Sequence, residues 1–208
     1  MNRKFISKSN YVLHKVLNSK QGVEILKDFI ESILEIEIKE ISLNPYLEKI
    51  KNKLPAEENF GIADVRIKTN EDEEMNIGVQ FIDGEHISTK MLLYYAQIHL
   101  NQVLYENRKI AKTITINLLD FYYSKKDTYF NKIIIDEKNS KKSEMDLIEL
   151  ISIELPKFKV KEENKMSKKE AWISYFKGEN VNYATKKYNK IAMLDKLLIK
   201  YWDEEVIE

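Results

Sequence analysis

Residues 60–82 read FGIADVRIKTNEDEEMNIGVQFI, and this stretch decides the fold of the chain. Apolar and polar residues alternate on both sides of an acidic segment centred near Asp72. Such alternation is typical of two half-buried strands joined by a turn. Because side chains on a strand alternate with a period of two, one face of the pair is polar and the other apolar. The stretch therefore predicts a β-hairpin.

The register of this hairpin decides which polar side chains meet. With the turn centred near Asp72, antiparallel pairing places Asp64 opposite Gln80 and Arg66 opposite Gly78. The apolar members point the other way, toward a core: Val65, Ile67, Ile77 and Val79. Considered alone, the pattern predicts an amphipathic hairpin with one solvated face.

The composition is that of an ordered, globular chain. Of the 208 residues 43% are hydrophobic and 33% are charged, with only five Gly and three Pro, which excludes a disordered chain. There is no Cys, which excludes disulfides, thiolate metal sites and cysteine nucleophiles. The length suits one main domain. We expect this domain over residues 1–160, with a helical extension over residues 161–208 packed on it.

The charge and hydropathy of the chain give less information about its binding partners. The formal net charge is zero, so the global balance does not indicate a polyanionic partner. Lysines recur among aromatic residues between Pro156 and Lys200, which suits either a phosphate backbone or a solvated helical surface with its aromatics in the core. Residues 1–17 lack the apolar core of a signal peptide, and no segment reaches the roughly 18 apolar residues of a membrane span. We therefore expect a cytoplasmic protein without a membrane partner.

Periodicity predicts the remaining elements. Apolar residues at helical spacing predict helices over residues 19–34, 88–107 and 181–202, with a further helical segment from Ser167. The second of these helices carries a broad apolar face that includes Met91, Leu92, Tyr95, Ile98, Leu100, Val103 and Leu104. Apolar and β-branched runs predict strands over residues 36–43, 113–122, 129–135 and 147–155. Together with the hairpin, these elements predict an α/β domain.

The hairpin resembles the active-site hairpin of the PD-(D/E)XK nucleases, in the branch of recombination-promoting nucleases and transposases. That branch carries an Asp on the first strand and Glu-x-Gln on the second; here DVRIK is followed by NIGVQ. Other segments resemble the family in the same order: SNYVLHKVL, GVEILKDFIESIL, ISLNPYL, TKMLLYYAQIHLNQVLYE, ITINLLDF and IELPKF. The resemblance implies an α/β fold with a PD-(D/E)XK restriction-endonuclease-like core, a mixed sheet flanked by helices, and a helical C-terminal extension.

The resemblance also implies a DNA endonuclease with Mg²⁺ as its cofactor. Asp64 lies where the family has its metal-binding Asp, and Gln80 where it has the Gln that orients the attacking water or the scissile phosphate. The backbone carbonyl of Val79 and the carboxylate of Glu24 are implied as further metal ligands, since Mg²⁺ prefers oxygen ligands. Lys90 lies where an Arg is usual and is implied as a contact to the DNA substrate.

One position departs from the family in a way that affects catalysis. Gly78 stands where the family has the Glu of Glu-x-Gln, so a main carboxylate ligand is missing. Glu74 lies four residues away, about 13 Å along a strand, too far to replace it. We therefore expect weak or no metal-dependent cleavage, whether the chain is a naturally degenerate copy or carries an engineered Glu-to-Gly change. The alternatives are a non-catalytic DNA-binding module and a protein-interaction module, and a homodimer is left open.

Overall fold

The computed structural model describes residues 10–44, 63–82, 86–105, 110–134, 148–160 and 162–205. The chain forms two compact units. The first comprises residues 1–38, 120–129 and 154–208, and the second comprises residues 39–119 and 130–153. The predicted domain boundary after residue 160 stays a prediction.

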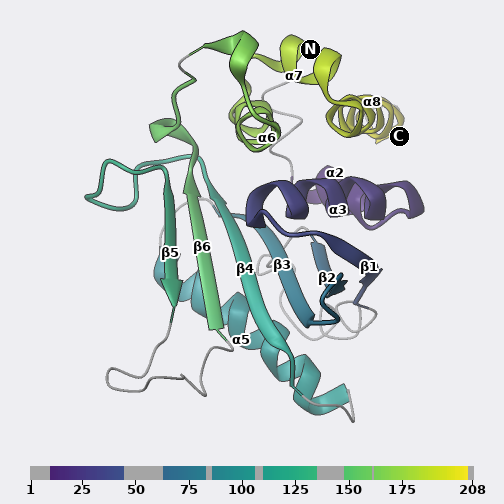
Figure 1. The fold of residues 1–208 in the computed structure, drawn as a ribbon, viewed down its shortest axis with the longest axis vertical. Helices are drawn as coiled ribbons and strands as arrows, with labels where there is room; N and C mark the ends of the chain where they lie inside the picture. Colours follow the sequence, from purple (N-terminus) through teal and green to yellow (C-terminus); the bar gives the residue numbers. More distant parts are fainter. Residues whose placement is uncertain are drawn as a thin grey trace. The chain divides into compact units, whose positions relative to one another are not determined.

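The second unit is built on a six-stranded sheet with the order β1-β2-β3-β4-β6-β5 (Figure 1). The strands are β1 (Ile38–Leu43), β2 (Ala63–Thr69), β3 (Glu74–Ile82), β4 (Lys112–Leu119), β5 (Phe130–Ile134) and β6 (Ile148–Glu154). The pairs β2–β3 and β5–β6 are antiparallel, whereas β3–β4 is parallel. The parallel pair requires a crossover, which is supplied by helix α5 (Ile87–Tyr105). The predicted α/β fold with a mixed sheet is confirmed.

The hairpin is present, but its predicted register is wrong. Asp64 pairs with Gly78, and Arg66 pairs with Asn76. The turn is centred one residue earlier than predicted, at residue 71. Within it, the N–H of Asp72 donates to the carbonyl of Thr69 at 3.0 Å. Moving the centre of the turn by one residue moves every partner by two, which leaves each side chain on its predicted face.

Helix α5 covers the face of the sheet that carries the polar side chains of the hairpin (Figure 1). The hydroxyl of Tyr94 donates to the carbonyls of Ala63 at 2.9 Å and Val79 at 3.3 Å. About two turns further along, the amide of Gln102 donates to the hydroxyl of Thr113 at 2.9 Å. These bonds fix the helix against β2, β3 and β4.

The first unit is a cluster of helices (Figure 1). Its elements are α2 (Asn10–Leu17), α3 (Lys20–Leu34), the short 3-10 helices η2 (Leu155–Lys157) and η3 (Glu163–Lys165), α6 (Lys168–Lys177), α7 (Val181–Lys187) and α8 (Asn189–Glu205). Phe29 of α3 packs edge-on against Trp172 and Phe176 of α6, with ring centroids 5.5 Å apart in both cases. Asp28 accepts from the indole N–H of Trp172 at 2.9 Å and pairs with Lys168 at 2.7 Å.

This packing bears on the lysine- and aromatic-rich stretch. Trp172, Tyr175 and Phe176 are buried, while Lys169 and Lys190 form ion pairs at the surface of the unit. For these residues the arrangement is that of a solvated helical surface with its aromatics in the core. No helix among the described residues has the length and apolar character needed to span a membrane.

The predicted helix over residues 181–202 is interrupted. Tyr188 has extended backbone angles (φ −121°, ψ 110°) and separates α7 from α8. Its hydroxyl donates to the carbonyl of Met166 at 2.9 Å, as the ammonium of Lys187 does at 3.0 Å. These two bonds hold the junction to the segment that precedes α6.

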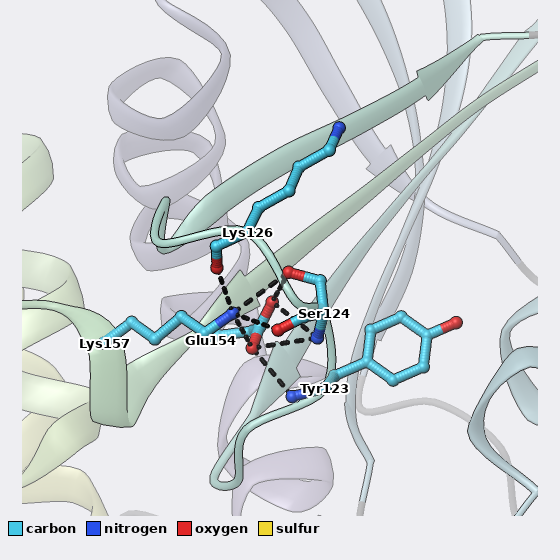
Figure 2. A network of polar contacts seen from close by, with 5 residues as sticks. All are labelled: Tyr123, Ser124, Lys126, Glu154 and Lys157. Atoms are coloured by element: carbon cyan, nitrogen blue, oxygen red, sulfur yellow. Dashed lines mark hydrogen bonds and ion pairs between the residues drawn. The ribbon is translucent and has the colours of Figure 1, made fainter.

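The predicted strand over residues 113–122 ends early, at Leu119. Beyond it, Figure 2 shows a network of polar contacts centred on Glu154. The backbone N–H groups of Tyr123 and Ser124 donate to the Glu154 carboxylate at 2.7 Å and 3.2 Å. Lys157 pairs with the same carboxylate at 2.7 Å and donates to the carbonyl of Lys126 at 2.6 Å. The backbone N–H groups of Tyr123 and Ser124 therefore bond to the Glu154 carboxylate and do not extend the hydrogen bonding of β4.

Candidate functional site

Three neighbouring strands place Asp64, Gly78 and Thr115 in one row across the sheet. Asp64 of β2 pairs with Gly78 of β3, which pairs with Thr115 of β4. In the next row but one, Gln80 pairs with Asn117. Because alternate residues of a strand share a face, all five positions lie on the face that α5 covers. The hairpin thus brings together the Asp and Gln singled out in the sequence.

This face is buried, so the predicted solvated face is wrong. Asp64 is 0% exposed, Gln80 2% and Asn117 0%. The amide of Gln80 donates to the side-chain oxygen of Asn117, whose own amide donates to the carbonyl of Ile151 at 2.7 Å. The Gln80 side chain is therefore held in a chain of hydrogen bonds that crosses from β3 to β6.

The side chain of Asp64 is buried, and the described residues give its carboxylate no hydrogen-bond partner. Neither of its two carboxylate oxygens is bonded within the described residues. Burial raises the pKa of Asp64 from 3.8 to about 8. By contrast Glu149, another buried carboxylate of the sheet, is paired with Lys112 at 3.2 Å and Lys132 at 2.6 Å. Asp64 is consequently protonated in most molecules at neutral pH.

Two buried amides of the second unit also lack hydrogen-bond partners among the described residues. Asn76 of β3 and Asn101 of α5 are both 0% exposed, and neither has a side-chain hydrogen bond within the described part of the chain. Nearby, burial and the charge of ionised Asp64 hold the pKa of the Tyr94 hydroxyl well above its usual value. Unpaired buried polar groups are costly and are rare in ordinary cores. Their presence under α5 is typical of a functional rather than a purely structural interface.

Gly78 lies under two side chains of α5. A Cβ atom built at Gly78 would lie 2.7 Å and 2.8 Å from two ring carbons of Tyr94, and it would overlap the terminal methyl of Ile98. The Tyr94 ring cannot move freely, because its hydroxyl is hydrogen-bonded to two backbone carbonyls. The helix therefore occupies the space that any side chain at position 78 would need.

A sequence model of the PD-(D/E)XK nuclease family transposases matches residues 7–203. The chain belongs to this family. A search of curated proteins and a search of solved structures each returned no match. Membership supports a nuclease or transposase type of function in general, with DNA as the substrate class, and nucleases of this family generally use divalent metals.

The other predicted site residues are divided between the chain's two units. Lys90 is on α5, one turn before Tyr94, and it is partly exposed. Glu24 is on α3 of the first unit, where its carboxylate lies 3.5 Å from the ammonium of Lys190. Asp64, Val79 and Gln80 belong to the second unit. Whether Glu24 shares a metal with Asp64 stays a prediction.

The residues around Asp64 do not fit a divalent metal in this arrangement. Asp64 is the only carboxylate in its row, and the carbonyl of Val79 accepts the hydroxyl of Tyr94. Among the described residues no three His, Asp or Glu side chains gather as ligands. A hard cation prefers several oxygen ligands, and this side of β3 offers one carboxylate that is protonated at neutral pH.

Sequence reasoning missed the partners of the hairpin on β4 and α5. Residues 113–117 read TITIN, which places Thr113, Thr115 and Asn117 on one face of β4. This alternation was a usable signal, because a central strand buried only among apolar side chains has no reason for it. Tyr94 was recognisable only as a buried aromatic residue, since its contact with Gly78 depends on how α5 packs.

Substituting Gly78 with alanine should destabilise the fold, by about 1–3 kcal/mol, through overpacking against α5. In an open strand the same change would be neutral or mildly stabilising, because alanine restricts the unfolded chain. Urea denaturation of the wild type and the variant measures the difference. In an Ile98→Val background, which removes the overlapping methyl, the cost of Gly78→Ala should be smaller. Equal costs in the two backgrounds would contradict the packing seen here.

Proposed function

We propose that this chain is a DNA-directed member of the nuclease family that cleaves DNA weakly or not at all in the presence of Mg²⁺. The pairing of Asp64 with Gly78 carries the proposal. A metal-dependent site in this hairpin needs a second carboxylate beside Asp64, and the chain has none there. Family membership supports DNA as the substrate class.

In this proposal the remaining polar groups keep their family roles in part. Gln80 would orient a phosphate or water, and Lys90 would contact the DNA backbone as a point charge. The role of Gln80 requires α5 to move, because Gln80 is buried and hydrogen-bonded to Asn117. The docked position of α5 thus supports low activity independently of the missing carboxylate.

Relaxation of supercoiled plasmid in the presence of Mg²⁺ tests the catalytic part. The wild type should nick no faster than Asp64→Asn. The double variant Gly78→Glu/Ile98→Ala should gain Mg²⁺-dependent nicking, because it supplies the carboxylate and removes the Ile98 methyl, the closest of the atoms that crowd position 78. Gly78→Gln/Ile98→Ala has the same shape without the charge and should gain nothing. Rapid nicking by the wild type that Asp64→Asn abolishes would refute weak activity.

The alternative is a DNA-binding module without any catalytic role. The filling of the Gly78 site by Tyr94 and Ile98 favours it, because it leaves no room for a side chain at this position. Under this alternative the Gly78→Glu/Ile98→Ala variant remains inactive while DNA affinity persists and falls steeply with salt. Absence of DNA binding at low salt would exclude both functions and leave a protein-interaction module.

A further inference from the structure

Helix α5 presents apolar side chains to solvent and buries polar ones. Leu92, Leu93, Leu100, Val103 and Leu104 are 57%, 50%, 51%, 56% and 58% exposed. On the opposite side Asn101 is 0% and Gln102 2% exposed. The broad apolar face predicted from the sequence therefore covers the sheet only in part. We call the five exposed side chains the α5 apolar face.

Among the described side chains, the fully exposed positions of α5 carry no charge, and the charged residue Lys90 is only partly exposed. The exposed positions, among the side chains that the structure describes, are Ser88, Thr89, Leu92, Leu93, Ala96, Leu100, Val103 and Leu104. Surface helices normally place charged residues on their solvent side. A nucleic acid or a charged protein surface would find no counter-charge here. Two copies of this face, by contrast, meet without like-charge repulsion, so the charge pattern favours self-association.

The spacing on this face fits a second helix. Leu93, Ala96, Leu100 and Val103 follow one another at intervals of three, four and three residues. This is the a/d pattern by which two helices pack side by side. Ala96 in the middle is small, which allows two helix axes to approach closely.

We propose that the α5 apolar face packs against the α5 apolar face of a second copy of this chain. The five side chains present roughly 400–500 Å² of apolar surface per copy, at the upper end of what an uncomplexed protein exposes in one patch. Complete burial of these side chains in two copies would remove about 800–1,000 Å² from solvent, at or just below the lower limit of specific interfaces. A reversible dimer, dissociating on dilution, is the assembly that such an area supports.

Sedimentation equilibrium of the full chain over a wide range of concentration tests the proposal. The wild type should shift from monomer to dimer mass, and Leu100→Glu should raise the dissociation constant by roughly 100-fold, because symmetry places two carboxylates in one interface. The matched control is Ile133→Glu, which changes a 48% exposed side chain on the edge strand β5 and should leave the dimer intact. A wild type that stays monomeric overturns the proposal. So does a dimer lost with Ile133→Glu and kept with Leu100→Glu.

A second measurement uses the absence of cysteine from the chain. Ala96→Cys introduces a single thiol in the middle of the α5 apolar face. A short thiol-reactive crosslinker should then give a covalent dimer of Ala96→Cys and little of the control Ile133→Cys. Both substitutions are at exposed positions, and circular dichroism checks that each variant is folded. Equal crosslinking of the two variants would show that the crosslinks form in random collisions between molecules, and it would overturn the proposal.

Discussion

Replacing Asp64 with asparagine should stabilise the fold, and the gain should grow as the pH rises. The Asp64 carboxyl has no hydrogen bond from the described residues, and its complete burial raises its pKa from 3.8 to about 8. In the unfolded chain the same carboxyl ionises at its ordinary pKa. The folded state of the wild type therefore holds a proton that the unfolded state releases, and folding becomes less favourable at higher pH.

The direction of the pKa shift of Asp64 determines how the free energy of unfolding changes with pH. The contribution of protonated Asp64 is fully present below pH 3.8 and is lost as the pH rises toward about 8. From about pH 5 to about pH 8, the free energy of unfolding of Asp64→Asn relative to the wild type should increase by roughly 3–4 kcal/mol. Urea denaturation of both proteins at several pH values measures this difference. A difference that is flat across this range would mean that Asp64 is ionised in the folded protein.

Two controls show whether the effect belongs to Asp64. Asp72, on the turn of the same hairpin, is exposed, and hydrogen bonds from Lys68 and Lys39 hold its pKa below the usual value. Its contribution to stability is present above the ordinary pKa and is lost as the pH falls, so Asp72→Asn should show no pH dependence between about pH 5 and pH 8 and the opposite sign below the ordinary pKa. Added Mg²⁺ should leave the difference between the wild type and Asp64→Asn unchanged at neutral pH. A smaller difference with Mg²⁺ would show that the cation reaches the carboxylate.

Replacing Glu154 with glutamine should be among the most damaging single changes in the first unit. Glu154 is 0% exposed, and its carboxylate accepts from Lys157 at 2.7 Å, from the hydroxyl of Ser124 at 2.6 Å and from the N–H of Tyr123 at 2.7 Å (Figure 2). Removing one member of a buried ion pair leaves the other charge uncompensated and typically costs about 3–5 kcal/mol. Thermal or urea denaturation of Glu154→Gln measures the loss.

The pH dependence of this carboxylate has the usual sign for an acid. Burial alone would raise the pKa of Glu154, but hydrogen bonds from Lys157, Ser124 and the amide of Tyr123 outweigh burial and lower it. Its contribution is therefore present above the ordinary pKa and is lost in acid. The exposed pair of Lys165 and Glu162 is the matched control, and Glu162→Gln should cost about 0–1 kcal/mol. Equal costs for the two substitutions would contradict the network in Figure 2.

Much of the fold was predictable because it rests on local patterns. The strands at residues 63–69 and 74–82 and the helix at residues 20–34 were predicted to within a few residues. In each case the hydrophobic period agrees with the local backbone. The predictions were wrong where a contact with a residue far away in the sequence determines where a helix or strand ends. Tyr188 interrupts the last helix through its bond to Met166, and Glu154 captures the amides that follow β4.

The sequence predicted which residues form the candidate site, but it did not predict how they are buried and packed. The resemblance placed Asp64, Gly78 and Gln80 together, and the corrected register keeps all three on one face. Their burial, the isolation of the Asp64 carboxyl and the filling of the Gly78 position depend on α5. The orientation of that helix could not be inferred, since both of its sides carry apolar residues.

The sequence by itself determined the family, the order of the elements and the polar side chains that share a face of the hairpin. A period of two is a property of the strand itself, so it needs no knowledge of the surroundings. Only the tertiary structure decided that this face is covered by Tyr94 and Ile98, that Asp64 holds its proton, and that leucines of α5 face solvent. Burial is set by what packs from elsewhere in the chain, and no local pattern specifies it.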